Sequence, residues 1–291
     1  MKLELLKSIL ASVQKPSQYL GNEANAIHKD FNQSKVRVCL IFADAYEIGM
    51  SHMGLKILYE ILNSIDGVVA ERCFAPMPDM EAALREHELP LFSLESKTPL
   101  NEFDIIGISL PYELTYTNVL NIIDLAGIPI FQKDRKDHHP LILTGGTQSY
   151  NPEPMADFLD AVAIGDGEEL IIDVIQKVVS WKNEQGIDQI KLNKKEGSRQ
   201  NLLDSLTDVE GLYIPQFFEP IYNEDGTLQE TKALKPGYDS VKKRIVQDLN
   251  KVSCAGTVAN SSLRYCLPVP YGGLPSCAYT SGSFTAFRSH W

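Results

Sequence analysis

The sequence predicts an α/β fold in which helices cover both faces of a mainly parallel sheet. Strand-like and helix-like segments alternate as far as residue 181, which is typical of parallel βαβ units. The strand-like segments are continuous apolar runs, as expected of strands buried on both faces, and glycine-bearing turns follow several of them. Hydrophobic residues make up 44% of the chain and charged residues 22%, an ordinary globular balance.

The first unit, residues 36–62, organises the rest of the chain. Residues 36–43 form an apolar, β-branched run that predicts a buried strand, and residues 44–49 read as a polar loop. A helical period then begins near Ser51, which is the predicted N-cap. This arrangement places the loop at the carboxyl end of a parallel strand and beside a helix N-terminus, where doubly wound sheets bind ligands.

The remaining elements follow the same periodicity rules. Further strands are predicted at 68–75, 91–94, 103–110, 140–144 and 160–164, and helices at 80–87, 115–126 and 170–181. Residues 182–210 read as surface helices, and residues 211–246 as short strands with a hairpin turn at 223–226. The basic cluster Lys242-Lys243-Arg244 is interpreted as a solvated face.

We expect four segments along the chain. They are a helical arm at 1–29, an α/β domain at 30–185, an α+β extension and linker at 186–250, and an irregular tail at 251–291. Residues 252–291 contain no Asp or Glu and hold no helical or strand period, so we interpret the tail as a linker or an out-of-frame segment.

Charge and composition exclude several classes of function. The net charge of -11 disfavours a nucleic-acid partner, because a phosphate backbone would be repelled. No apolar run is long enough to span a membrane, and the N-terminus lacks the apolar block of a secretory signal, so we expect a cytoplasmic protein.

The five cysteines do not form a motif. Cys39 and Cys73 lie in apolar strands and are predicted to be buried free thiols. Cys254, Cys266 and Cys277 are too widely spaced for a compact zinc or iron–sulfur site, so no metal site is predicted.

The turns that follow the strands predict a ligand site. Because carboxyl ends of parallel strands meet at one edge of a sheet, the acidic loop after residue 43 and the paired glycines 145 and 146 should face a common crevice. The glycines expected to converge there are Gly49, Gly145, Gly146, Gly165 and Gly167. Glu168 is expected to cap a helix or bond ligand hydroxyls or amides, and no catalytic residue is predicted.

Two motifs resemble those of cobalamin-binding domains. Asp44, Tyr46 and Gly49 have the spacing of the Asp-x-His-x-x-Gly loop, with tyrosine in place of the cobalt-ligating histidine. A phenol with a pKa of about 10 is a poor replacement for a neutral imidazole, so no lower cobalt ligand is expected at Tyr46. His52 is an alternative ligand, although a capping or packing role is the simpler interpretation. Ser109 and Gly145-Gly146 stand where that family makes room for the nucleotide tail.

Residues 17–250 resemble the N-terminal half of an uncharacterised radical S-adenosylmethionine family that fuses a B12-binding-like domain to a radical SAM barrel. The resemblance rests on YLGNEANAIHKD, DAYEIGMSHMGLKILYEILN, the Asn-Pro-Glu-Pro at 151–154 and the Gly-Asp-Gly-Glu-Glu at 165–169. It implies a Rossmann-like fold of the cobalamin-binding or flavodoxin-like type, and cobalamin as the cofactor of this module.

In the same family, the barrel carries the Cys-x-x-x-Cys-x-x-Cys motif, the [4Fe-4S] cluster and S-adenosylmethionine. The three C-terminal cysteines do not reproduce that motif. We therefore expect this chain to be truncated before the barrel and inactive by itself, with the barrel as its partner in the full-length protein.

Two other functions are consistent with the sequence. A degenerate domain could bind no cofactor and serve as a docking or dimerisation surface, which the tyrosine at position 46 favours. A flavodoxin-like domain that binds a nucleotide or flavin is disfavoured, because the loop after the first strand is acidic rather than rich in Ser, Thr and Gly.

Overall fold

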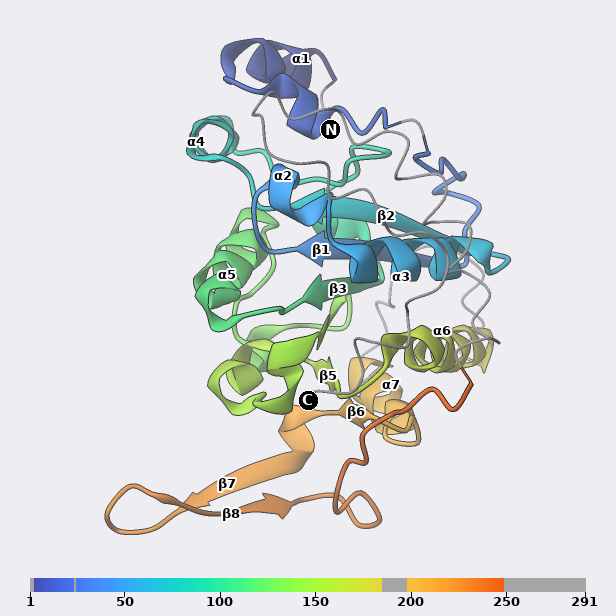
Figure 1. Ribbon diagram of the computed structural model, residues 1–291, viewed down its shortest axis with the longest axis vertical. Helices are drawn as coiled ribbons and strands as arrows, with labels where there is room; N and C mark the ends of the chain where they lie inside the picture. The colour runs from blue at the N-terminus through green and yellow to red at the C-terminus, as the bar shows by residue number, and fades with distance from the viewer. Residues whose placement is uncertain (1–2, 24, 185–197, 249–291) are drawn as a thin grey trace, which may run out of the picture.

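A six-stranded, mainly parallel sheet forms the centre of the computed structural model, which describes residues 3–23, 25–184 and 198–248 (Figure 1). The strands are β1 (Val36–Phe42), β2 (Val68–Phe74), β3 (Ile105–Ser109), β4 (Leu141–Gly145), β5 (Ala161–Ala163) and β6 (Leu212–Tyr213). Their order is β2-β1-β3-β4-β5-β6. The first five are parallel, and β6 pairs antiparallel with β5. The predicted α/β fold is therefore confirmed.

Helices cover both faces of this sheet (Figure 1). One face packs against α3 (Met53–Ser64), α6 (Gly167–Glu184) and α7 (Ser198–Leu206). The other face packs against α1 (Leu3–Ser12), α4 (Pro78–Glu86) and α5 (Tyr116–Leu125). The shorter helical turns are α2 (Tyr46–Gly49), η1 (Pro16–Tyr19), η2 (Leu100–Glu102), η3 (Glu113–Thr115), η4 (Gln132–Asp134), η5 (Thr147–Tyr150), η6 (Glu153–Phe158) and η7 (Pro215–Phe217).

Strand β1 is apolar except for Arg37, which is itself buried. All seven residues are buried. Val38 and Leu40 pack toward α3 and α6, whereas Cys39 and Ile41 pack toward α4 and α5. Cys39 and Cys73 are buried free thiols, as predicted, and burial raises the pKa of the Cys73 thiol to about 12.

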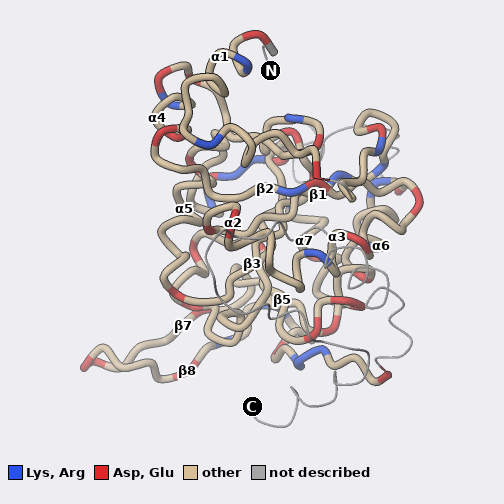
Figure 2. Tube along the Cα trace, turned by 45° about the horizontal axis from the view of Figure 1, so that its top comes forward, with Lys and Arg blue, Asp and Glu red and all other residues tan. Residues whose placement is uncertain are grey.

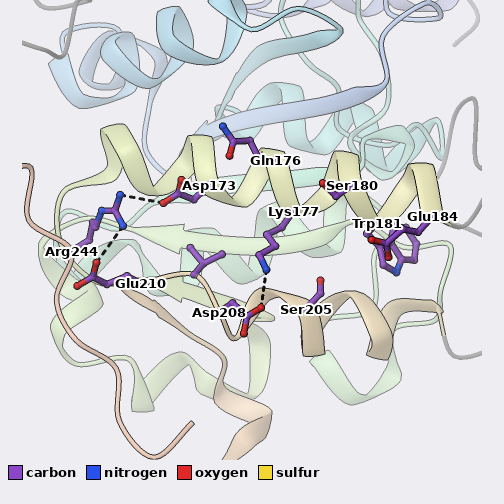
Figure 3. A pocket seen from close by; sticks show the side chains of 11 residues that line it. Asp173, Gln176, Lys177, Ser180, Trp181, Glu184, Ser205, Asp208, Glu210 and Arg244 are labelled. Carbon is purple, nitrogen blue, oxygen red and sulfur yellow. Dashed lines mark hydrogen bonds and ion pairs between the residues drawn. The ribbon is translucent and has the colours of Figure 1, made fainter. Parts of the chain in front are cut away.

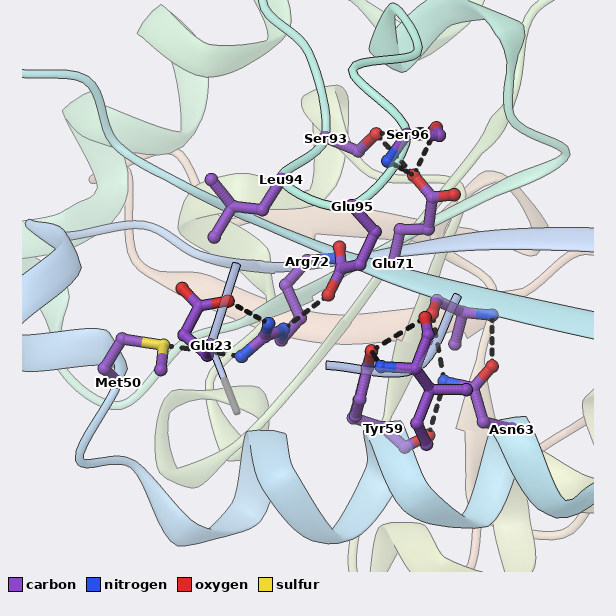
Figure 4. Close-up of polar contacts among 12 residues, drawn as sticks. Glu23, Met50, Tyr59, Asn63, Glu71, Arg72, Ser93, Leu94, Glu95 and Ser96 are labelled. Carbon is purple, nitrogen blue, oxygen red and sulfur yellow. Dashed lines mark hydrogen bonds and ion pairs between the residues drawn. The ribbon is translucent and has the colours of Figure 1, made fainter. Parts of the chain in front are cut away.

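The outer edge of β2 is closed by side chains and a loop instead of another strand (Figure 4). The Asn63 amide donates to the Ala70 carbonyl at 3.0 Å and accepts from the Ala70 N–H at 3.1 Å. The Glu95 carboxylate accepts the Arg72 N–H at 2.7 Å, and the Leu94 N–H donates to the Arg72 carbonyl at 2.7 Å. These bonds satisfy backbone groups that would otherwise invite pairing with another chain.

The same edge holds a buried charge cluster. The Arg72 guanidinium bonds Glu95 at 2.7 Å and Glu23 at 2.8 Å, and it lies over the Tyr59 ring. Glu71 is buried beside it and accepts hydrogen bonds from the hydroxyls of Ser93 at 2.5 Å and Ser96 at 2.7 Å. Each buried charge has polar partners, which offsets its loss of hydration.

The N-terminal arm packs against the sheet edge and the α4 side of the core. Leu6 and Ile9 of α1 are buried there. Gly21 approaches the loop after α4 so closely that a Cβ atom would lie 1.9 Å from the Leu94 carbonyl oxygen, and its φ is +65°. Glu47 accepts hydrogen bonds from Lys15 and Gln18, which ties the arm to α2.

Residues after α7 extend the fold in two ways. Strand β6 completes the main sheet, and Arg199 of α7 bonds the buried Asp160 carboxylate at 2.6 Å. The hairpin of β7 (Phe218–Tyr222) and β8 (Leu228–Ala233) then projects from the body (Figures 1 and 2).

Three predictions outside the cavity differ from the structure. Residues 44–49 include the short helix α2, because Gly49 and Met50 donate to carbonyls four residues back. Residues 91–94 contribute one bridge, Phe92 to Pro99, instead of a strand. Arg244 is not simply solvated, because it forms ion pairs with three carboxylates of α6 and the loop before β6, namely Glu169, Asp173 and Glu210.

Over the described residues, Lys and Arg are dispersed among many elements rather than gathered into one stripe (Figure 2). No helix of this part of the chain combines the length and apolar character needed to cross a bilayer.

Replacing Asn63 by leucine tests the closed edge of β2. The variant keeps the side-chain size but leaves the buried N–H and carbonyl of Ala70 without partners, so we expect a loss of about 2–4 kcal/mol in the free energy of unfolding. Urea denaturation measures it. Asn22, which is exposed, is the control, and Asn22→Leu should unfold at the wild-type midpoint. Equal midpoints for the two variants would show that the edge needs no capping.

Candidate functional site

A cavity of about 320 Å³ lies at the carboxyl edge of the sheet, beneath the first turns of α3 and α6. Its floor is formed by β1, β3, β4 and β5. Its residues are mostly apolar or glycine: Leu40, His52, Gly54, Ile57, Leu58, Gly107, Ile108, Ser109, Pro111, Leu143, Thr144, Gly145, Gly146, Thr147, Ala163, Gly165, Gly167, Glu168, Leu170 and Ile171. This volume is within the usual range for small-molecule sites.

The cavity exists because three residues with small side chains or none, Gly107, Ser109 and Gly145, lie close together on one face of β3 and β4. Leu40 of β1 is paired with Gly107 of β3, which is paired with Leu143 of β4. One residue pair further along the same face, Ser109 is paired with Gly145. The missing side chains leave a hollow that α3 and α6 cover without filling. A Cβ atom on Gly107 would already lie 3.2 Å from Leu40 Cδ2.

Two glycines let neighbouring segments close the cavity rim. Gly146 has a φ of +118°, and a Cβ atom there would lie 2.7 Å from the Leu110 carbonyl oxygen. Gly165 has a φ of +116°, and a Cβ atom would lie 2.1 Å from the Arg244 carbonyl oxygen. Residues 244–246 therefore return to the rim, where the Val246 N–H donates to the Asp166 carboxylate at 2.9 Å.

Two helix N-termini open on this cavity. Gly167 and Glu168 begin α6, and Gly54 lies in the first turn of α3. The dipoles of these two helices favour an anionic group at the mouth. Ser109 adds a hydroxyl from the end of β3, and no other described residue forms a hydrogen bond with that hydroxyl. The site thus combines an apolar interior with a polar mouth.

His52 lies at the cavity as the N-cap of α3. Its Nδ1 accepts the Leu55 N–H at 3.1 Å, and its ring packs against Phe42 with centroids 4.8 Å apart. An accepting Nδ1 places the proton of the neutral ring on Nε2, so metal ligation through Nε2 would disrupt the cap. The predicted cap was Ser51, and this prediction was wrong: its hydroxyl donates to the Ile48 carbonyl at 2.7 Å and ends α2.

The acidic loop residues lie outside the cavity lining. The Asp44 carboxylate accepts the Tyr112 hydroxyl and, at 2.7 Å, the Ala45 N–H. The Tyr46 hydroxyl donates to Glu23 at 2.7 Å. Burial, followed by the Glu23 hydrogen bond, raises the pKa of Tyr46 far above that of a free phenol. Both side chains thus stabilise the turn after β1.

Gly49 also has a packing role. A Cβ atom at this position would lie 2.3 Å from the Phe74 ring, so only glycine lets α2 lie against the end of β2. The Tyr46 ring meets the same Phe74 edge-on, with centroids 5.4 Å apart. The acidic loop and the paired glycines occupy the same edge of the sheet, but only the glycines line the cavity.

The structure therefore brings together seven of the residues predicted for the site: His52, Ser109, Gly145, Gly146, Gly165, Gly167 and Glu168. It does not bring Asp44, Tyr46 or Gly49 into the lining. Sequence reasoning missed the floor at Gly107 and Ala163 and the helix side chains Ile57, Leu58 and Ile171. The isolated glycine in the strand at 103–110 was the available signal, since glycine within a buried strand often marks a close approach.

A larger hollow of about 600 Å³ lies between α6 and the segment that runs from α7 toward β6 (Figure 3). Both cations of its lining form ion pairs with carboxylates of the same lining. Lys177 bonds Asp208 at 2.8 Å, and Arg244 bonds Asp173 at 3.2 Å. The smaller cavity lies where the carboxyl ends of the parallel strands converge, so it is the better candidate for ligand binding.

The described residues contain no group of three or more His, Cys, Asp or Glu side chains arranged to hold a metal ion. Cys254, Cys266 and Cys277 lie outside the described residues.

The His52 cap predicts a pH dependence of stability. Burial lowers the pKa of His52 below its ordinary value of 6.5, so at lower pH the unfolded chain binds a proton that the folded chain does not. Stability should therefore fall as the pH drops below about 6.5, by about 1 kcal/mol, the usual value of an N-cap. His52→Asn keeps a capping side chain and removes the titration.

Urea denaturation between pH 7 and pH 5 should show the wild type losing more stability than His52→Asn. His139, whose pKa is lowered to about 4 chiefly by burial and by His138, is present in both proteins and cancels in the difference. Parallel pH profiles would contradict this role of His52.

Comparison with known proteins supports a family assignment. A family described as radical SAM proteins, N-terminal, matches residues 54–215, more than half of the 291-residue chain. The match begins in the first turn of α3 and includes β3, β4, β5 and α6, which form most of the cavity. No curated protein and no solved structure matches. The chain belongs to the family of N-terminal domains of radical SAM proteins.

Proposed function

We propose that this chain is the corrinoid-presenting module of a radical SAM protein, and that the cavity beneath α3 and α6 receives the nucleotide tail of the corrinoid. The observation that carries the proposal is the glycine-lined hollow beside the switch point between β1 and β3, next to the first turns of α3 and α6. The resemblance to cobalamin-binding motifs at Ser109 and Gly145-Gly146 supports it.

The residues present fit such a group. A flat heteroaromatic base is matched by the apolar walls from Leu40, Leu143 and Ile171, and Gly107 and Gly145 leave room for it. The N-termini of α3 and α6 suit the phosphodiester of the tail. Glu168 offers a carboxylate at the mouth for hydroxyl or amide donors.

A corrinoid supplies redox-active cobalt when bound. This chain would hold and orient it without a lower cobalt ligand, because the Tyr46 hydroxyl is committed to Glu23 and His52 Nδ1 to the α3 backbone. The iron–sulfur cluster and S-adenosylmethionine would belong to the radical SAM barrel, to which the module would present its cofactor.

A second function, a docking domain without a cofactor, is favoured by one observation. Tyr46, at the position where cobalamin-binding loops carry the ligating histidine, is a half-buried structural residue bonded to Glu23 and packed on Phe74. A chain that failed to bind any corrinoid would retain this function.

Titration with hydroxocobalamin tests the first proposal. We expect a change in the visible spectrum and coelution of the corrinoid on gel filtration. Gly145→Leu fills the cavity and should weaken binding at least about tenfold, equivalent to about 1.4 kcal/mol. Ala82→Leu, on the exposed side of α4, is the matched control and should bind like the wild type. No spectral change and no coelution with the wild type would remove the proposal.

The same titration tests the absence of a protein ligand to cobalt. His52→Asn preserves the α3 cap and removes the only nitrogen of this residue that could bind cobalt, so we expect an unchanged spectrum of the bound corrinoid. If His52 were a cobalt ligand, the variant would shift the visible bands to those of a water-bound or unligated form. That result would contradict the tautomer inferred from the Leu55 hydrogen bond.

A further inference from the structure

The hairpin of β7 and β8 presents an unusually open surface. All β8 residues except Ala233 are exposed, and the side chains of Tyr222 and Leu228 near the tip are 60% and 51% exposed. The hairpin packs against the body at the start of β7, where the Phe218 ring lies on the Tyr213 ring with centroids 4.7 Å apart. A two-stranded ribbon that extends from the body in this way has marginal stability without a further strand or covering layer (Figure 1).

The hydrogen-bond pattern between β7 and β8 shows which backbone groups of the hairpin point outward and could pair with another strand. The Leu234 N–H donates to the Phe217 carbonyl at 2.8 Å, so this position faces β7. Because antiparallel strands alternate, the N–H and C=O groups of Thr231 and Ala233 face away from β7. The outer edge of β8 therefore offers donors and acceptors to another strand.

The outer edge of β7 lacks this property. Pro220 is paired with Thr231, at a position whose backbone groups also face away from the partner strand. A proline there has no N–H to donate, so pairing along β7 is interrupted. The hairpin thus has one open edge and one blocked edge.

The outer edge of β8 is complementary in hydrogen bonding and charge to the same edge of a second copy of the chain. In an antiparallel pair with a twofold axis at Thr231, the two Thr231 residues would exchange both backbone hydrogen bonds. Glu230 would then lie opposite Lys232 of the second copy, and Lys232 opposite its Glu230. These two pairs occupy non-hydrogen-bonded positions, where side chains approach most closely. Neither Glu230 nor Lys232 forms an ion pair with another described residue.

We propose that two copies of this chain associate through their β8 edges to form a four-stranded antiparallel sheet. The assembly would close at two chains, because both outer edges of that sheet would be β7 strands blocked by Pro220. Phe218, Pro220, Tyr222 and Leu228 share one face of the hairpin, so the dimer joins two apolar faces into one. The proposal does not depend on corrinoid binding, since the hairpin lies outside the cavity lining.

Charge reversal with mixing is the decisive test. Sedimentation velocity of the full chain should give a concentration-dependent mass that approaches two chains. Glu230→Lys places lysine opposite lysine at two symmetric positions and should weaken association at least about tenfold. Lys232→Glu should do the same. An equimolar mixture of the two variants should restore association, because both cross-strand pairs then have opposite charges.

Glu224→Lys, at the exposed hairpin tip, makes the same change in charge outside the pairing edge and should leave association at the wild-type value. Thr231→Pro removes an outward N–H and should abolish association while the far-ultraviolet circular dichroism stays unchanged. A single-chain mass at every wild-type concentration, or a mixture of charge variants that fails to associate, would overturn the proposal.

Discussion

The register of the three central parallel strands is the constraint on which the candidate site depends. Pairing of Leu40 with Gly107, and of Ser109 with Gly145, places the small residues of β3 and β4 at one end of one sheet face. A shift of one residue would turn these positions toward α4 and α5 and fill the hollow with larger side chains. The cavity is therefore a property of strand pairing rather than of any single loop.

Polar contacts at the β2 edge and two buried charge clusters support this register. Asn63, Glu95 and Leu94 complete the hydrogen bonding of β2, and Arg72 connects Glu95 with Glu23 of the N-terminal segment. At the other end of the sheet, the buried Asp160 carboxylate bonds Arg135 and Arg199, which joins β5 to α7. Removing the central Arg72 or Asp160 would leave buried charges without their ion-pair partner, so these contacts favour one arrangement of the chain.

The turn after β1 and the cavity have separate roles. Asp44, Tyr46 and Gly49 bind the turn to Tyr112, Glu23 and Phe74, so they position the β1 end and the start of α3. The cavity is lined instead by glycines, apolar side chains and the first turns of two helices, which are the groups that would contact the proposed ligand. This division explains how a chain without a histidine at position 46 can retain a well-formed cavity. It also separates both features from the β7–β8 hairpin, whose open edge faces away from the body (Figure 1).

The sequence by itself determined the layered α/β fold, most of its strands and helices, and the glycine turns at the carboxyl edge, because buried strands and amphipathic helices have distinct periods. It also located seven of the cavity residues, since strand ends of a parallel sheet must meet. Only the tertiary structure decided that Asp44 and Tyr46 bond to Tyr112 and Glu23, and that His52 rather than Ser51 caps α3. Tyr112 and Glu23 are far in the sequence from the residues they bond, whereas Ser51 and His52 are neighbours that can both cap a helix. Hydrophobic periodicity carries no information about either choice. The cavity floor at Gly107 likewise required strand register, which depends on contacts between strands far apart in the chain.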